Sequence, residues 1–175
     1  CNFRVAFSTT LQRRIYVCRA VLIVSENLTH VEGYTGVHQF GLTSDDVASI
    51  TFLDCAFLTI VPHGFLDFFP NLTGLHFNRC GIIKLQGDEL QEYPNLVWFA
   101  LESSALEEIP GNFLQNTPNL GGVSFGGNEL KSVGANLLSN LPMLHRVYFL
   151  NTPCISMNAR NAEEILAIID ALRIN

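Results

Sequence analysis

The stretch LGGVSFGGNELKSVGANLLSNLPM, residues 120–143, is one of three consecutive segments that share one apolar pattern. LTGLHFNRCGIIKLQGDELQEYPN begins at Leu72 and LVWFALESSALEEIPGNFLQNTPN begins at Leu96, so successive copies start 24 residues apart. A further copy, LHRVYFLNTPCI, begins at Leu144. Self-similarity at a fixed period predicts a solenoid in which each copy forms one coil, and stability comes from stacking neighbouring coils.

The outer copies are atypical, as end units of a solenoid have to be. A copy with one extra residue, VASITFLDCAFLTIVPHGFLDFFPN, begins at Val47, and a divergent copy begins at Cys18. The divergent copy keeps four apolar positions in register, namely Val21, Ile23, Leu28 and Val31. We therefore predict one domain over residues 1–175, with an N-terminal cap and divergent repeat (1–46), regular repeats (47–155) and a C-terminal cap (156–175).

Apolar residues at the first, fourth and sixth positions, such as Leu96, Phe99 and Leu101, predict a short strand whose inward side fills the core. The ninth position turns the chain inward, so its side chain has to satisfy backbone groups that the turn leaves unpaired. Asn does this best, because its amide both donates and accepts. In chain order the ninth residues are Glu26, Cys55, Cys80, Ser104, Asn128 and Thr152, of which Glu26 departs from the pattern.

The segments that return from one strand to the next place large apolar residues under the convex side, namely Phe65, Leu90, Phe113 and Leu137. After the last copy, Asn161 followed by Glu164 is typical of a helix N-cap with a reciprocal acid. Apolar residues then recur at helical spacing, namely Ile165, Leu166, Ile168, Ile169 and Leu172. We predict a helix over residues 162–173 that covers the last coil.

The sequence resembles the leucine-rich repeat family, whose pattern L-x-x-L-x-L-x-x-N/C-x-L is met almost completely by residues 72–141. The copy spacing, the Pro-Asn-Leu segments and DV...FFPNL are similar to secreted arthropod members. The resemblance implies an α/β repeat fold, a right-handed solenoid with a parallel concave sheet and irregular convex returns. It also implies a non-enzymatic recognition module for protein or glycan ligands, with roles from innate recognition to matrix and receptor assembly.

Composition limits the partners. The formal net charge of -6 and the ten Lys and Arg residues argue against nucleic acid and anionic membranes, since both need a concentrated basic face. The apolar runs are too short for a transmembrane helix, so we expect no membrane insertion. No cofactor is expected either.

Several features favour export. The chain begins with Cys1, which suggests that a signal peptide has been removed or the chain trimmed. Asn27-Leu-Thr and Asn71-Leu-Thr are glycosylation sequons, although such triplets also occur by chance. We therefore expect a secreted, extracellular glycoprotein.

The five cysteines have structural interpretations. Cys1 and Cys18 bracket a predicted hairpin, CNFRVAFSTTLQRRIYVC, where a disulfide would close the exposed first edge of the sheet. Cys55 and Cys80 occupy equivalent positions of adjacent coils, close enough for a bridge, but their turn position favours buried thiols. Cys154 is either buried, or bridges two chains, or has lost a partner.

Catalytic and metal sites are not favoured. His76 and Cys80 supply two of the four ligands that structural zinc requires, so no metal site is expected. Ser124 and His76 share the concave side, but the sequence places no orienting acid beside them. The glycine-rich stretch is not a phosphate loop, because Gly127 is followed by an amide, an acid and an aliphatic residue.

Strand alternation assigns the outward positions of the concave face. The third positions are Ala20, Ser49, Gly74, Trp98, Gly122 and Arg146. The fifth are Leu22, Thr51, His76, Ala100, Ser124 and Tyr148, and the seventh are Val24, Leu53, Asn78, Glu102, Gly126 and Leu150. The longer return over residues 32–46 is expected to cover an apolar group at the N-terminal end, namely Leu22, Val24 and Leu53.

The candidate ligand contacts are Trp98, His76, Tyr148, Arg146, Glu102 and Ser124, with Gly122 and Gly126 as a bare floor. Trp98, the single tryptophan, either shields its small neighbours or anchors a partner, since Trp, Tyr and Arg dominate binding hot spots. Two alternatives stay open. One is a structural protein that forms a homodimer through the concave face or Cys154, and the other is a small-molecule carrier around Trp98.

Overall fold

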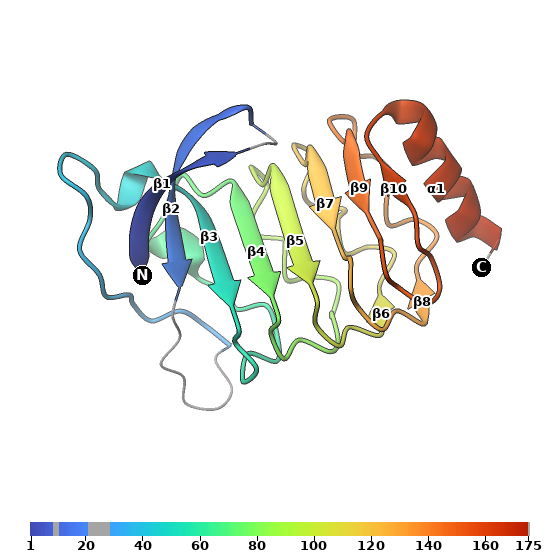
Figure 1. The fold of residues 1–175 in the computed structure, drawn as a ribbon, viewed down its shortest axis with the longest axis horizontal. Coiled ribbons are helices and arrows are strands. Elements are labelled where there is room, and N and C mark those ends of the chain that lie inside the picture. The colour runs from blue at the N-terminus through green and yellow to red at the C-terminus, as the bar shows by residue number, and fades with distance from the viewer. Residues whose placement is uncertain (9–10, 21–28, 175) are drawn as a thin grey trace.

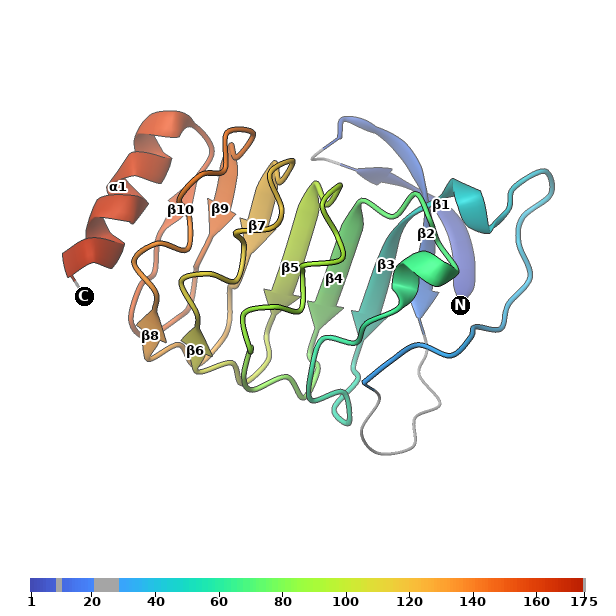
Figure 2. The same cartoon turned by 180° about the vertical axis from the view of Figure 1, so that it is seen from behind.

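An eight-stranded sheet runs along the molecule in the computed structural model, which describes residues 1–8, 11–20 and 29–174 (Figure 1). Its repeated part consists of parallel strands, namely β3 (Val47–Leu53), β4 (Gly74–Asn78), β5 (Trp98–Glu102), β7 (Gly122–Ser124) and β9 (Arg146–Tyr148). The return segments lie behind this sheet, where β6 (Glu108–Ile109) pairs with β8 (Ser132–Val133) (Figure 2). The predicted parallel solenoid is confirmed.

The register of the repeats agrees with the sequence pattern. Third positions lie side by side in the order Ser49, Gly74, Trp98, Gly122 and Arg146. Because strand residues alternate between faces, this register sets the fourth and sixth positions on the core side. The predicted inward and outward faces are therefore correct from β3 to β9.

The predicted register of the divergent first copy is wrong by three residues. In β2 (Arg13–Ala20), Val17 pairs with Ser49 and Cys18 with Ile50. Ala20, which we expected on the concave surface, lies opposite Phe52 and is buried. The reason is that β2 is also the second strand of the hairpin, whose disulfide brings Cys18 to the core side. The remaining positions assigned to this copy lie outside the described residues, namely Val21, Leu22, Ile23, Val24, Glu26 and Leu28.

Stacked phenylalanines form the centre of the core. Phe52 and Phe77 have ring centroids 5.0 Å apart with an interplanar angle of 2°, and Phe125 stacks on Phe149 at 5.7 Å. The apolar residues predicted under the convex side are all buried, namely Phe65, Leu90, Phe113 and Leu137. Phe99 contacts both Phe77 and Phe125 and so connects the two stacks. Burial is therefore shared between coils rather than completed within one.

The eighth residue of every regular coil has a left-handed backbone, with φ between 52° and 70°, at Asp54, Arg79, Ser103, Gly127 and Asn151. In the first four, its N–H donates to the seventh-position carbonyl of the next coil, as from Arg79 to Glu102 (3.1 Å) and from Gly127 to Leu150 (2.8 Å). In the last coil, the N–H of Asn151 donates to Ser156 Oγ (3.2 Å). The hydrogen-bond ladder therefore continues past the end of each strand while the chain turns inward. Glycine adopts this conformation without steric cost, which explains Gly127.

The ninth side chains complete the turn as predicted. Cys55 Sγ, Cys80 Sγ and Ser104 Oγ each donate to the seventh-position carbonyl of their own coil. Asn128 does more, because its Nδ2 donates to the carbonyls of Leu101 (2.7 Å) and Phe125 (2.8 Å). Its Oδ1 accepts from the backbone N–H groups of Ser104 (3.1 Å) and Leu106 (3.4 Å). Four backbone groups thus depend on one buried amide.

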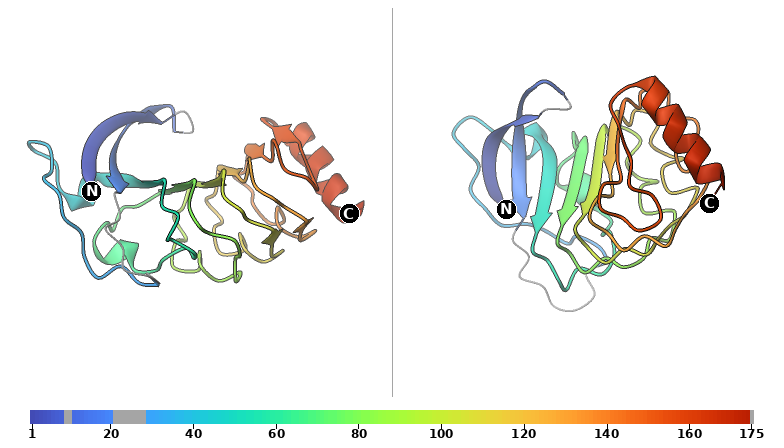
Figure 3. Two further views of the ribbon diagram at one scale, coloured as in Figure 1. Left: turned by 60° about the horizontal axis from the view of Figure 1, so that its bottom comes forward. Right: turned by 45° about the vertical axis from the view of Figure 1, so that its right-hand side comes forward.

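The N-terminal hairpin extends the sheet. β1 (Asn2–Ser8) pairs antiparallel with β2, and the predicted disulfide joins Cys1 to Cys18. The hairpin arches out of the sheet on its concave side (Figure 3). Phe3 is the inward residue of β1 and is buried, so the base of the hairpin belongs to the core.

The long return over residues 32–46 does not cover the concave face, contrary to our expectation. It packs on the opposite side of the hairpin, where the ring of Tyr34 meets that of Phe3 edge-on and the His38 ring stacks on Phe3 at 4.0 Å. The N–H of Gln39 also donates to Tyr16 Oη (2.9 Å). This placement helps to bury Phe3 and Tyr16 at the N-terminal end of the core.

The C-terminal helix α1 (Ala162–Ile174) ends one residue later than predicted. Asn161 Oδ1 accepts from the Glu164 N–H (3.0 Å), whereas the Glu164 carboxylate accepts from the Arg160 N–H (2.6 Å). The helix buries Ile165, Ile168 and Leu172 over the last coil. Ahead of it, β10 (Asn158–Ala159) pairs antiparallel with β9, a strand that the sequence did not indicate. In the described part of the chain, no helix is long and apolar enough to cross a membrane.

Cys55 and Cys80 are buried thiols in this structure, as their turn position favours. Burial raises the pKa of the Cys80 thiol to about 12, and the neighbouring Cys55 adds to the effect. Cys154 is a half-buried thiol whose backbone N–H bonds to the Leu130 carbonyl (3.1 Å). A dimer through Cys154 stays a prediction.

Replacing Asn128 with alanine removes the partner of four backbone groups at once. We expect Asn128→Ala to lower the free energy of unfolding by about 3 kcal/mol, since buried unpaired groups are costly. Urea denaturation provides the measurement. Asn95→Ala is the matched control, because Asn95 is exposed, and we expect it to change stability by less than about 0.5 kcal/mol. Equal losses in the two variants would contradict the role of Asn128.

Candidate ligand-binding site on the concave face

The central strands bring the predicted contact residues together. Trp98 lies between Gly74 and Gly122 in the sheet, and Arg146 follows Gly122. Parallel pairing sets the equivalent residues one strand spacing apart, about 4.8 Å. The concave side of β5, β7 and β9 is therefore one continuous surface with a large ring at one side and a cation at the other.

The Trp98 indole lies over Gly122. A Cβ atom added to Gly122 would approach Cε3 of the indole to 2.6 Å, closer than real contacts allow. Gly122 is buried for this reason, so it is not the bare floor that we expected. On its far side the indole meets the Tyr148 ring at a centroid distance of 6.2 Å and an angle of 62°. The missing side chain of Gly122 lets two aromatic rings meet across β7.

A cavity of about 510 Å³ opens beside this pair of rings. Of the predicted contacts, six line it, namely Trp98, Glu102, Ser124, Gly126, Arg146 and Tyr148, whereas His76 and Gly122 do not. The lining also includes Ser103, Gly127, Leu150, Asn151 and Asn158. Both a carboxylate and a guanidinium face this space, together with amides and two aromatic rings.

For three of the lining residues that we did not predict, the sequence contains a recognisable pattern. Ser103, Gly127 and Asn151 are all eighth-position residues, and their left-handed turns bring backbone and small side chains to the rim. The recurrence of turn-favouring residues at this position could have identified them. Asn158 had no such signal, because it reaches the site only through the pairing of β10 with β9.

Glu102 is held between two neighbours. His76 Nε2 lies 3.0 Å from Glu102 Oε2, and Ser124 Oγ donates to Glu102 Oε1. The hydrogen bond with His76 lowers the pKa of Glu102 below its ordinary value of 4.5, and Ser124 contributes in the same direction against the effect of burial. The carboxylate is therefore ionised and fixed in orientation. His76 takes part in the site by positioning Glu102 rather than by lining the cavity.

This network corrects our expectation that no acid stands beside Ser124 and His76. The order of contacts is nevertheless histidine, carboxylate, serine, so the serine hydroxyl donates to the acid and not to an imidazole. A nucleophilic serine needs its proton taken by a base and its oxygen open to substrate. Ser124 is 2% exposed, so the geometry makes it a support for Glu102 rather than a contact residue.

One of the two sequons lies within the described residues. Asn27 lies outside the described residues. Asn71 is exposed, and its Nδ2 donates to the Asp45 carbonyl (2.9 Å), so its glycosylation stays a prediction.

Over the described ranges, no three His, Cys, Asp or Glu side chains come together as a metal site would require.

Comparison with known proteins supports the fold. No family model matches the chain, and no curated protein matches it in sequence. Among solved structures, it is similar to a chain of the Toll–Spätzle complex of Drosophila, with a TM-score of 0.54 and 16% sequence identity. The match covers 65% of this chain and 15% of that chain, so this protein spans a small part of its neighbour's length. At this identity the similarity is one of fold.

Gly122→Ala tests the packing of the indole. The added Cβ has no space beneath Trp98, so the ring has to move towards solvent, and we expect its fluorescence emission to shift to longer wavelength. The measurement is direct because Trp98 is the single tryptophan. Gly126→Ala is the control, since its Cβ would meet the Leu150 carbonyl at 3.1 Å and not the indole. A folded Gly122→Ala protein with unchanged emission would refute this packing.

Glu102→Gln tests the electrostatics of the network. A carboxylate with a lowered folded-state pKa stabilises the protein above its unfolded-state pKa, and this contribution disappears as the pH falls through the lowered value. We therefore expect the stability difference between wild type and Glu102→Gln to be constant above about pH 4.5 and to shrink below it. Urea denaturation across this range measures it. A difference that does not change with pH would show that His76 and Ser124 do not stabilise the ionised form.

Proposed function

We propose that this protein is an extracellular, non-enzymatic recognition module of the leucine-rich repeat class, which binds a protein or glycan ligand on its concave face. The repeat pattern, the inward-turning ninth residues and the parallel sheet support the class. The Cys1–Cys18 disulfide supports an oxidising compartment, where such bonds form and persist. The sequon at exposed Asn71 fits the same location.

The observation that carries the proposal is the lining of the cavity on β5, β7 and β9. Trp98, Tyr148 and Arg146 surround it, and these are the three residue types that contribute most to binding hot spots. The fixed carboxylate of Glu102 supplies a charge opposite to that of Arg146 on the same surface. A partner would thus meet an oriented site whose polar groups need little rearrangement.

Of the two proposed ligand classes, protein and glycan, a protein ligand is the better supported. The similar solenoid belongs to a complex described as a molecular hub in Drosophila development and innate immunity. That description concerns the Toll–Spätzle complex, and it supports our proposal of a protein partner for this chain. Innate recognition is accordingly our proposed process.

A small-molecule carrier is the second candidate. The cavity volume of about 510 Å³ falls within the range of about 300–1,000 Å³ that is usual for small-ligand sites. Two aromatic rings beside a few polar groups are also typical of such sites. A small molecule released when the purified natural protein is denatured, and detected by mass spectrometry, would favour this candidate.

The test is capture from the extracellular fluid of the source organism. We expect the immobilised protein to retain a protein or glycoprotein that is lost, by about tenfold or more, from the Trp98→Ala/Tyr148→Ala variant. Quantitative mass spectrometry of the captured material is the measurement. The recovered ligand is then titrated against the wild type while Trp98 fluorescence is followed.

The matched control carries Phe57→Ala and Ile83→Ala, two exposed apolar residues outside the sheet. It also truncates two large apolar side chains at the surface and is expected to capture the ligand as the wild type does. If both double variants capture the same material equally well, the concave site is not the binding surface.

A further inference from the structure

The N-terminal hairpin has a charge opposite to that of the rest of the protein. Residues 1–25 contain four arginines and no acid, whereas the remaining residues contain six basic and all sixteen acidic side chains, a formal net charge of -10. The overall net charge of -6 does not reveal this local excess of positive charge. Within the described residues, the side chains of Arg4, Arg13 and Arg14 make no ion pair.

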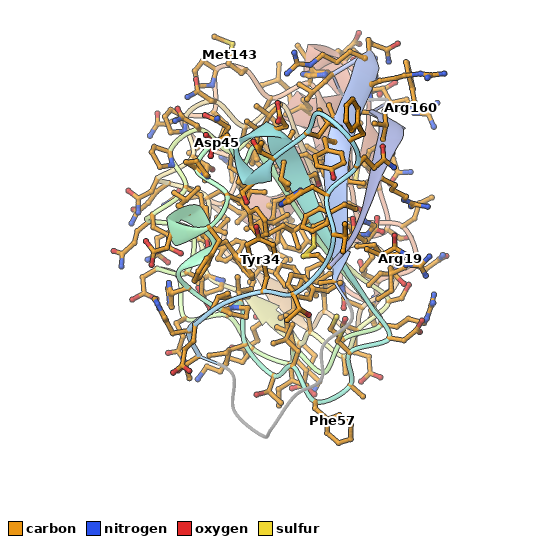
Figure 4. The ribbon with its side chains drawn as sticks, turned by 90° about the vertical axis from the view of Figure 1, so that its left-hand side faces the viewer. Arg19, Tyr34, Asp45, Phe57, Met143 and Arg160 are labelled. Atoms are coloured by element: carbon orange, nitrogen blue, oxygen red, sulfur yellow. A yellow bond between two sulfur atoms is a disulfide. The ribbon has the colours of Figure 1, made fainter. Side chains whose placement is uncertain are left out.

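The two faces of the hairpin differ. Arg4 lines a cavity of about 240 Å³ beneath the hairpin together with Val17 and Trp98, which places Arg4 on the concave side. Arg13 and Arg19 share that face, because they pair with Ser8 and Asn2, each an even number of residues from Arg4. Figure 4 shows Arg19 on the outer side of the hairpin, away from the core around Tyr34.

The other face of β1 is apolar and becomes open towards the tip. Phe3 is 5% exposed, Val5 is 44% exposed and Phe7 is 61% exposed, although strand alternation gives all three the same direction. The hairpin leaves the core as it arches away, so the two later residues lose their cover (Figure 3). Exposed large apolar residues on a strand commonly mark a place where another chain binds.

β1 is also an edge strand, and part of its edge is open. It is the end member of the eight-stranded sheet. The segment after the hairpin covers its start, where the N-terminal ammonium donates to the Thr35 carbonyl and Gln39 Nε2 to the Phe3 carbonyl. Since alternate residues of an edge strand direct their backbone groups outward, Val5 and Phe7 present theirs on the same side as Phe3. No covering hydrogen bond reaches these two among the described residues.

We propose that the β1 edge from Arg4 to Ser8 is a docking site for an extended segment of a partner protein that alternates acidic and apolar residues. The segment adds as a further strand. Its backbone pairs with Val5 and Phe7, its acids face Arg4, and its apolar side chains cover Phe7. No residue of β1 lines the 510 Å³ cavity, although Arg4 and Phe7 line the neighbouring one with Trp98. The proposal therefore does not depend on the function proposed above.

Charge and chemistry select this occupant over others. A second copy pairing through β1 would supply no acid for Arg4, because residues 1–25 contain none. A sulfated polysaccharide would match the arginines, but it has no backbone N–H groups for an open sheet edge and no apolar side chains for Phe7. A peptide strand satisfies all three features at once.

The experiment uses fluorescence anisotropy with the full chain and a fluorescein-labelled peptide of the same length as β1, seven residues, that alternates valine and glutamate. We expect saturable binding that Arg4→Glu weakens by at least about fivefold, since it converts an attractive cross-strand pair into a repulsive one. Phe7→Ser is expected to weaken binding as well. Arg160→Glu makes the same charge change on an exposed residue of the C-terminal cap and is expected to leave binding unchanged.

Two further probes separate strand addition from charge attraction alone. A peptide with N-methylated backbone amides keeps its charge but cannot pair at an edge, so we expect it not to bind. A valine and lysine peptide is expected not to bind either. Absence of binding by the glutamate peptide would overturn the proposal. It would equally be overturned if the N-methylated peptide and the Phe7→Ser variant bound normally while heparin competed, because that result describes a polyanion patch.

Discussion

At the inward turn after each strand, buried backbone N–H and C=O groups need hydrogen-bond partners within the protein. The rest of the solenoid depends on these hydrogen bonds. The eighth residue turns left-handed and donates to the next coil, and the ninth side chain accepts or donates where the strand has ended. Asn128 alone serves four backbone groups from two neighbouring coils. Once these groups are paired, the chain can return behind the sheet and the phenylalanines can stack from coil to coil.

The two ends of the solenoid close the core in different ways. At the C-terminus, α1 covers the last coil with Ile165, Ile168 and Leu172. At the N-terminus, a disulfide-linked hairpin extends the sheet, and a long return closes the core beneath it through Tyr34 and His38. β10 is the last strand of the sheet at the C-terminal end, and α1 packs against it, whereas β1 is the last strand at the N-terminal end. The open part of β1 follows from this choice of cap.

The concave site combines packing with electrostatics. Gly122 has no side chain, which lets the Trp98 indole lie flat and meet Tyr148. His76 and Ser124 hold the Glu102 carboxylate, whose lowered pKa keeps it charged in a site shared with Arg146. The basic hairpin belongs to a protein that is otherwise acidic, and its Arg4 shares a neighbouring cavity with Trp98. The two surfaces would attract partners of different chemistry.

The sequence by itself determined the coils, the inward and outward faces of β3 to β9, the disulfide and the terminal helix. These follow from periodic patterns of apolar residues and from residue types with one strong preference, such as Asn128 at the turn. Only the tertiary structure decided the register of β2, the position of the long return, the entry of Asn158 into the site and the order of His76, Glu102 and Ser124. The physical reason is that these four features depend on contacts between residues far apart in sequence. Several pairings satisfy the same local pattern, and burial of the whole core selects one of them.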